Sequence, residues 1–168
     1  GEVPAKPGMG APVERDPMNV LARLYAFKAA DAFILIYPLY AVMFVEDGLN
    51  PAQVALALAV WSVSAFVLEI PAGVVADRMP RRAVLAWAQV ARLAGYGLWM
   101  AYPYFWGFVG GFLLWGVKSA FTSGTFEALV YDELAATGRQ GDYARVIGRA
   151  DAVQFIAILA ASGAAALV

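Results

Sequence analysis

The sequence predicts an all-α integral membrane protein that crosses the bilayer with five helices. Hydrophobic residues make up 62% of its 168 residues and charged residues only 15%. A soluble domain of this size has too little interior to bury that much apolar surface. The apolar residues fall into five long runs, and the cations collect on one side of the arrangement that these runs imply. These observations predict a multi-pass protein whose first partner is the lipid bilayer.

The five runs are each long enough to cross a bilayer as a helix. A hydrocarbon core of roughly 30 Å requires about 20 helical residues, and an open strand edge cannot face lipid. We place the helices at residues 20–45, 52–76, 83–103, 105–131 and 146–168. Residues 1–17 are rich in Pro, Gly and charge without periodicity, which predicts a disordered cytoplasmic tail ahead of the helical part, residues 18–168.

The distribution of Lys and Arg predicts the orientation. Cations precede or open the first helix and occupy the second and fourth connections, at Lys6, Arg15, Arg23, Arg78, Arg81, Arg82, Arg139, Arg145 and Arg149. The first and third connections contain none. The positive-inside rule then places the N-terminus in the cytoplasm, and we expect a plasma-membrane location. The fifth helix runs outward and reaches the far interface near Val168, so we expect the protein to continue beyond this chain.

The composition excludes several functional classes. The sequence contains no Cys and no His, which removes thiol nucleophiles, His-based triads and the commonest transition-metal ligands. A net charge of −1 gives no reason to expect a nucleic-acid partner. An intramembrane aspartyl protease needs two facing carboxylates, but Gly141 and Asp142 lie in a polar loop. We therefore expect a protein that is not an enzyme and has no cofactor or metal.

The connection between the second and third helices carries the most specific motif of the chain. It reads GVVADRMPRR over residues 73–82. Glu69, Gly73 and Asp77 are four residues apart and share one helical face, where the glycine lets a neighbouring helix approach. The acid at the end of this face and the arginines after it form a compact charged group at the cytoplasmic surface.

The pattern G-x-x-x-D-R-x-x-R-R at this place resembles motif A of the major facilitator superfamily of secondary transporters. The match rests on Gly73, Asp77, Arg78, Arg81 and Arg82. Pro80 stands where the family usually has Gly. The SGTFEALVYDEL segment and the cytoplasmic N-terminus are similar to those of a drug exporter. The resemblance covers residues 18–168 and implies the N-terminal bundle of such a transporter, with the C-terminal half of the same protein as its missing partner.

The resemblance also implies roles for the motif residues. In that family the motif holds the cytoplasmic side shut while the transporter is open outward. Asp77 then lies at the contact between the two halves, and Arg81 pairs with an acid at the inner end of a neighbouring helix. Glu127 and Asp132 are the candidate partners. For Arg82 we favour a simpler role, a topogenic cation that contacts anionic headgroups.

Three charged residues are predicted to lie in the middle of the bilayer. Asp31 is about 11 residues into the first helix, or roughly 16 Å from the inner interface, and Arg92 and Lys118 reach a similar depth in the third and fourth helices. Such residues are costly and are functional candidates. We predict one polar cavity in which an Asp31–Lys118 pair exchanges a proton for a substrate contact. Snorkelling or a structural buried ion pair is the alternative for the two cations.

Other residues within the predicted spans are weaker candidates for a functional role. Lys118 precedes Gly124 by six positions, which partly matches motif B of proton-antiporting facilitators. Glu69 either stabilises the motif A region or touches substrate or proton. Tyr37 and Trp61 either line a cavity for a lipophilic substrate or pack between helices.

The resemblance implies a secondary transporter that exports a small organic or amphipathic compound in exchange for protons by alternating access. Two alternatives remain open. One is an uptake facilitator for a sugar, acid or siderophore-like solute. The other is a membrane sensor of facilitator ancestry that binds a partner without transporting anything.

Overall fold

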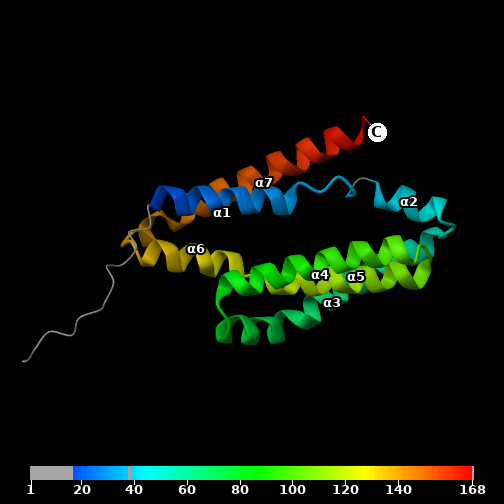
Figure 1. The fold of residues 1–168 in the computed structure, drawn as a ribbon, viewed down its shortest axis with the longest axis horizontal. Coiled ribbons are helices and arrows are strands. Elements are labelled where there is room, and N and C mark those ends of the chain that lie inside the picture. Colours follow the sequence, from blue (N-terminus) through cyan, green and yellow to red (C-terminus); the bar gives the residue numbers. More distant parts are fainter. Residues whose placement is uncertain (1–16, 38, 168) are drawn as a thin grey trace, which may run out of the picture.

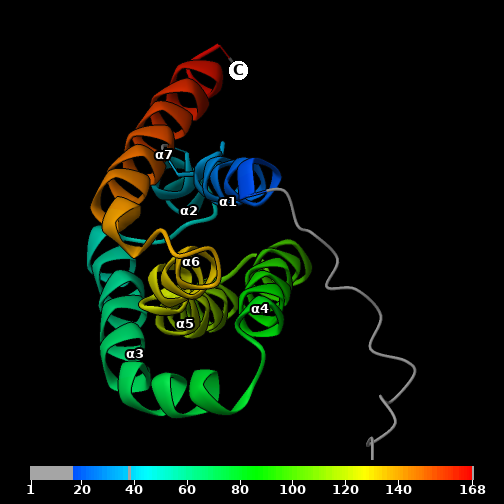
Figure 2. The ribbon, with the colours of Figure 1, turned by 90° about the vertical axis from the view of Figure 1, so that its left-hand side faces the viewer.

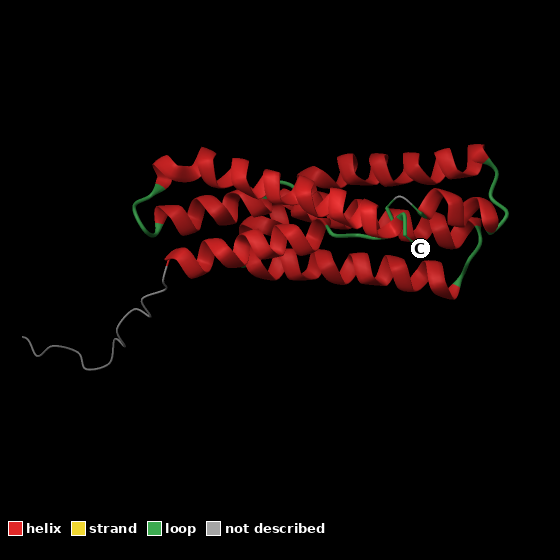
Figure 3. Cartoon of the chain, turned by 90° about the horizontal axis from the view of Figure 1, so that it is seen from above, coloured by secondary structure: helices red, strands yellow, loops and turns green. Residues whose placement is uncertain are grey.

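The computed structural model describes residues 17–37 and 39–167, and these form a bundle of helices that run along one long axis (Figures 1 and 3). No strand occurs among the described residues, so the all-α prediction is confirmed. The predicted tail, residues 1–17, lies outside the description except for Pro17, which opens the first helix.

The elements follow in chain order as α1 (Pro17–Ala32), α2 (Tyr40–Glu46), α3 (Pro51–Arg78), α4 (Arg81–Ala101), α5 (Phe105–Thr122), α6 (Thr125–Ala135), the 3₁₀ turn η1 (Gln140–Asp142) and α7 (Tyr143–Ala165).

Local residues explain why α3 and α4 start where they do. The Asn50 side chain accepts a hydrogen bond from the Gln53 amide at 2.9 Å, and the Gln53 side chain accepts one from the Asn50 amide at 3.0 Å. This reciprocal capping box, followed by Pro51, starts α3. Pro80 precedes α4 with φ −56°, a value that proline itself adopts, so this turn does not need the glycine that motif A usually has there.

The single helix predicted over residues 20–45 is wrong, because the chain leaves the helix between Ala32 and Tyr40. The apolar pattern runs through this break without a change. In the last turn of α1, the Asp31 carbonyl accepts a hydrogen bond from another helix, because Arg92 Nη1 on α4 donates to it at 2.8 Å. A guanidinium at a helix C-terminus satisfies a free carbonyl and complements the helix dipole. Pro38 lies outside the described residues.

The span predicted over residues 105–131 is also interrupted. α5 ends at Thr122 and α6 begins at Thr125. Gly124 between them has φ +70°, a left-handed conformation that glycine adopts without steric cost. Ser123 beside it has ψ 129° and is not helical either, so the interruption has a local cause, two adjacent residues whose backbones leave the helical region.

Two segments of the described chain, α3 and the combined stretch Gln140–Ala165, are long and apolar enough to cross a membrane by length and composition. Only 6% and 22% of their apolar windows are buried within the protein. Phe66 and Ile70 on α3 are 78% and 81% exposed, and Leu159 on α7 is 72% exposed. These helices are therefore unlike the core helix of a soluble protein, which buries most of its apolar surface. The remaining predicted spans do not meet the same criterion.

The bundle has two apolar cores, one toward each end. α5 lies between α3 and α4 and packs along both, while α1 packs along α7 (Figure 2). One core joins α1, α4, α6 and α7 through Leu24, Leu85, Phe126, Leu129, Val130, Leu134, Val146 and Ala150. The other is aromatic and joins α2, α3, α4 and α5 around Phe44, Trp99, Phe108, Phe112 and Trp115.

Candidate functional site

Asp31, Arg92 and Lys118 meet, as their depth in the predicted spans indicated. Lys118 Nζ on α5 lies 2.8 Å from Asp31 Oδ2, and Arg92 Nη1 on α4 lies 3.2 Å from Asp31 Oδ1. The three side chains are only 15% to 16% exposed. One carboxylate at the end of α1 thus connects three helices.

Gln89 is a fourth member of this cluster that the sequence did not reveal. Its Nε2 donates to Asp31 Oδ1 at 2.8 Å, while its own Oε1 is buried with no hydrogen-bond partner among the described residues. Gln89 lies three residues before Arg92 on α4, a spacing that places both side chains on one face. That spacing was the available signal, but an uncharged amide carries little insertion cost and does not stand out.

The cluster contains one more cation than carboxylates. Asp31 contacts both Arg92 and Lys118, and the surroundings are largely buried. Bringing charges out of water costs several kcal/mol per ion, about as much as their attraction returns. Because two cations share one carboxylate, the three side chains carry a formal charge of +1. A further anionic group can compensate this charge.

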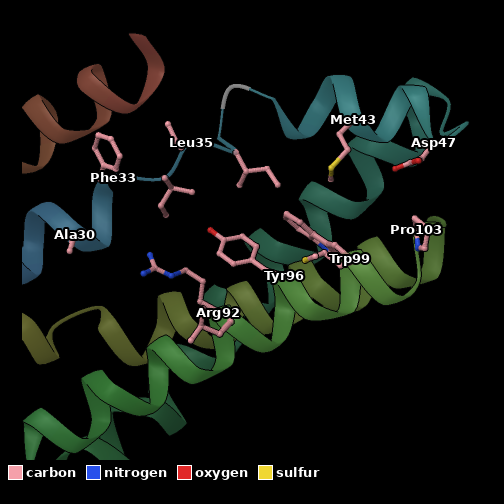
Figure 4. Close-up of a pocket in the computed structure, with 13 residues that line it drawn as sticks. Ala30, Phe33, Leu35, Met43, Asp47, Arg92, Tyr96, Trp99 and Pro103 are labelled. Carbon is pink, nitrogen blue, oxygen red and sulfur yellow. The ribbon is translucent and has the colours of Figure 1, made fainter. Parts of the chain in front are cut away.

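A groove of about 650 Å³ adjoins the cluster, between the segment after α1 and the side of α4. Its lining is mainly apolar and includes Phe33, Met43 and Trp99 (Figure 4). Arg92 lies toward one end and Asp47 toward the other. The groove thus places an apolar surface directly beside the charged cluster.

Two arginines of the segment that resembles motif A, Arg81 and Arg82, contact α6 from the start of α4. Arg81 Nε lies 2.6 Å from Asp132 Oδ2, so Asp132 is the contact that was predicted for Arg81. Glu127 is not, and this part of the prediction is wrong. Its Oε2 is buried without a hydrogen-bond partner in the described part of the chain. Five residues along a helix turn a side chain by about 140°, so Glu127 and Asp132 cannot face the same arginine.

Arg82 also has a contact within the protein, while its expected role as a topogenic cation stays a prediction. Its Nη2 contacts the Glu133 carboxylate, beside the Arg81–Asp132 pair. Two adjacent arginines at the start of α4 therefore meet two adjacent acids of α6. By contrast, Gly73, Asp77 and Arg78 are exposed, and within residues 17–37 and 39–167 no ion pair joins Asp77 or Arg78.

The three weaker candidates lie at helix contacts. Trp61 Nε1 donates to Ser119 Oγ at 3.2 Å, and Ser123 Oγ donates to Glu69 Oε1 at 3.4 Å, so both connect α3 to the α5 end. The Tyr37 ring meets the Trp115 ring edge to face at 5.3 Å. All three residues therefore make contacts between elements.

Lys28 makes a further contact between elements. Its Nζ lies 3.7 Å from Asp151 Oδ1 of α7 and 4.7 Å from the centre of the Phe126 ring. It therefore attaches α1 to α7 and α6.

No group of three or more potential metal ligands of the acidic, Cys or His type occurs within the residues that the structure describes. Comparison of the chain with protein-family models, with curated proteins and with solved structures finds no match.

Proposed function

We propose that this chain is the N-terminal helical bundle of a secondary transporter of the major facilitator type, which moves a small organic solute across the plasma membrane in exchange for protons. The observation that carries the proposal is the buried contact of Asp31 with Lys118 and Arg92 beside the groove. Ionisable residues inside a membrane are costly and, where present, mark ion or substrate pathways.

The break after α1 supports the same function. Secondary transporters build their sites near the midplane from discontinuous helices, whose ends supply free backbone groups and dipoles. Here α1 ends at Ala32, one residue past Asp31, and the Asp31 carbonyl accepts from Arg92. The carboxylate, the helix end and the guanidinium therefore lie at one point.

We assign the coupling proton to the Asp31 carboxylate. Protonation of Asp31 removes the negative charge that Lys118 and Arg92 contact, which weakens the attachment of α1 to α5 and α4. Loss of the proton restores both ion pairs. A proton entering from one side and leaving to the other thus changes how firmly α1 is held, and this change drives alternating access.

The cytoplasmic contacts complete the proposal. The Arg81–Asp132 and Arg82–Glu133 pairs hold α4 to α6, while Asp77 at the exposed end of α3 remains accessible. We assign Asp77 to a contact with the second bundle of the whole protein, and we place the N-terminus and this end of the helices in the cytoplasm.

The test uses the full natural protein in liposomes that contain a pH-sensitive dye. A panel of amphipathic anions, cations and sugars is added outside, and proton movement is recorded together with uptake of each labelled solute. We expect at least one solute to move protons, and Asp31→Asn to abolish that movement. Asp151→Asn is the matched control, because it removes a more exposed carboxylate that pairs with Lys28.

Two outcomes would contradict the proposal. Solute flux that is independent of the proton gradient, in the unmodified protein and in Asp31→Asn alike, would indicate an uptake facilitator. Solute binding without any flux would indicate a membrane sensor.

A further inference from the structure

The groove beside the cluster is built for a molecule with one polar end. Its walls are mainly hydrophobic, from the segment after α1 and from α4. The two charged residues of its lining, Arg92 and Asp47, lie at opposite ends (Figure 4). Ligand sites of this kind combine an apolar lining with a few placed polar groups that fix orientation.

At the Arg92 end, part of the guanidinium makes no hydrogen bond or ion pair with the residues that the structure describes. The contacts of Arg92 to the Asp31 carboxylate and carbonyl both use Nη1, so Nη2 and Nε are outside them. Tyr96, one turn further along α4, also lines the groove, and its hydroxyl is buried with no hydrogen-bond partner among the described residues. A buried hydroxyl without a partner is costly, so a ligand acceptor at this place would stabilise it.

The charge at this end favours an anion over a cation. Both oxygens of Asp31 are already in contact, Oδ1 with Gln89 and Arg92 and Oδ2 with Lys118. A cationic ligand would have to displace one of these partners from the carboxylate. An anionic group instead compensates the excess positive charge, and it can accept hydrogen bonds from Nη2 and Nε of Arg92.

The opposite end sets the direction of binding. Asp47 is an exposed carboxylate at the far end of the groove, and it repels an anionic group there. The Trp99 ring and Met43 lie between the two ends (Figure 4). A carboxylate, sulfonate or phosphate group therefore belongs at Arg92, and the apolar remainder of the molecule belongs along Met43 and Trp99.

We infer that the groove binds an amphipathic organic anion, with its anionic group held by the Arg92 guanidinium and the Tyr96 hydroxyl. The inference deepens the proposed function, on which it rests, by naming the chemical class of the transported solute.

The experiment measures binding to the full natural protein in nanodiscs of neutral phosphatidylcholine. The probes are tritiated 2-naphthalenesulfonate and a cation of the same ring, 2-naphthylmethylammonium. We expect saturable binding of the sulfonate, about tenfold tighter than that of the ammonium. Tyr96→Phe removes only the hydroxyl and should weaken sulfonate binding about tenfold, the effect of losing a hydrogen bond to a charged group. Arg92→Gln should weaken it further, and Arg92→Lys should restore part of the affinity.

Two control variants match these changes outside the groove. Tyr102→Phe removes the hydroxyl of an exposed tyrosine at the end of α4, and Arg145→Gln removes an exposed cation on α7. Both should bind the sulfonate as the unmodified protein does.

The inference is overturned if the ammonium binds as tightly as the sulfonate, if Tyr96→Phe leaves sulfonate binding unchanged, or if neither probe binds, as when another helix of the whole protein fills the groove. Its failure is distinguishable from failure of the transport proposal. Sulfonate binding without flux overturns only transport, whereas proton-coupled flux of another solute class without sulfonate binding overturns only the inference.

Discussion

Asp31 connects α1 to two other helices through one carboxylate, and its removal should cost stability as well as function. Asp31→Ala leaves the buried Arg92 and Lys118 without a counter-ion. Breaking a buried pair in this way typically costs about 3–5 kcal/mol. We expect a large fall in the thermal unfolding temperature of the protein in detergent.

A double variant separates the ion pair from other effects of the substitution. Asp31→Asn combined with Lys118→Gln removes one charge of each sign, so its stability loss should be smaller than the sum of the two single losses. Additive losses would show that Asp31 and Lys118 do not interact in the folded protein.

The Arg81–Asp132 pair predicts a much smaller effect. The Arg81 and Asp132 side chains are 29% and 54% exposed, and exposed pairs contribute about 0–1 kcal/mol. Asp132→Asn should therefore change the free energy of unfolding by about 1 kcal/mol or less, measured by chemical denaturation in detergent. If Asp132→Asn lowered the free energy of unfolding as much as Asp31→Ala does, the Arg81–Asp132 pair would not be a solvent-exposed contact.

At this scale the charged members of the site were predictable, and the uncharged ones were not. Asp31, Arg92 and Lys118 stand out because charge within an apolar run is costly. Gln89 and Tyr96 carry no such signal, since an amide or a phenol is tolerated on many helix faces. Glu127 was misassigned because its facing depends on helix phase after Gly124, which the residue types do not show.

The connection between α5 and α6 includes one backbone conformation that favours glycine. Gly124 has φ +70°, and an L-residue in that conformation costs about 1–2 kcal/mol. Gly124→Ala should destabilise the protein by about this amount, measured by thermal unfolding in detergent. Gly73→Ala is the control, because nothing lies within 4 Å of a Cβ there and alanine favours a helix interior. Equal effects of the two substitutions would argue against strain at Gly124.

The contact between α4 and α5 depends on another glycine. A Cβ on Gly111 would overlap the indole of Trp99, which is buried in the aromatic core. Gly111→Ala should cost about 1–3 kcal/mol through overpacking, again measured by thermal unfolding. Gly97→Ala on α4 meets nothing within 4 Å and should be neutral; if it were as damaging, the overlap at Gly111 would not be the cause.

Helix starts were more predictable than helix interruptions. Asn50, Pro51 and Gln53 form a local capping pattern that any chain would use to begin a helix. The end of α1 is different, because its carbonyl group is satisfied by Arg92 from a helix about sixty residues later in the chain. A break that depends on a distant side chain leaves no trace in the local apolar pattern.

The orientation of the whole molecule can be tested directly because the sequence contains no Cys. A single cysteine at Gly141 should react with a membrane-impermeant maleimide only from the cytoplasmic side, and one at Tyr104 only from the outside. The measurement is labelling of intact cells compared with opened cells. The reverse pattern would invert the proposed topology, and labelling of both sites in intact cells would exclude it.

The helical class of the molecule followed from its composition, and two of the five predicted spans meet a length and composition criterion in the structure. The others are shortened by the interruptions after α1 and α5 or contain the arginines of α4. A count of apolar runs does not distinguish a continuous helix from two shorter ones that end inside the bundle.

The break after α1 divides the first predicted span between two sets of neighbours. α1 packs along α7, whereas α2 packs against α3 (Figure 1). The described residues 33–37 and 39 connect the part that contains α1 to the part that contains α2. Phe33, Ile34, Leu35 and Ile36 in this connection also line the groove. Any molecule in the groove consequently contacts the connection between α1 and α2 on one side and α4 on the other.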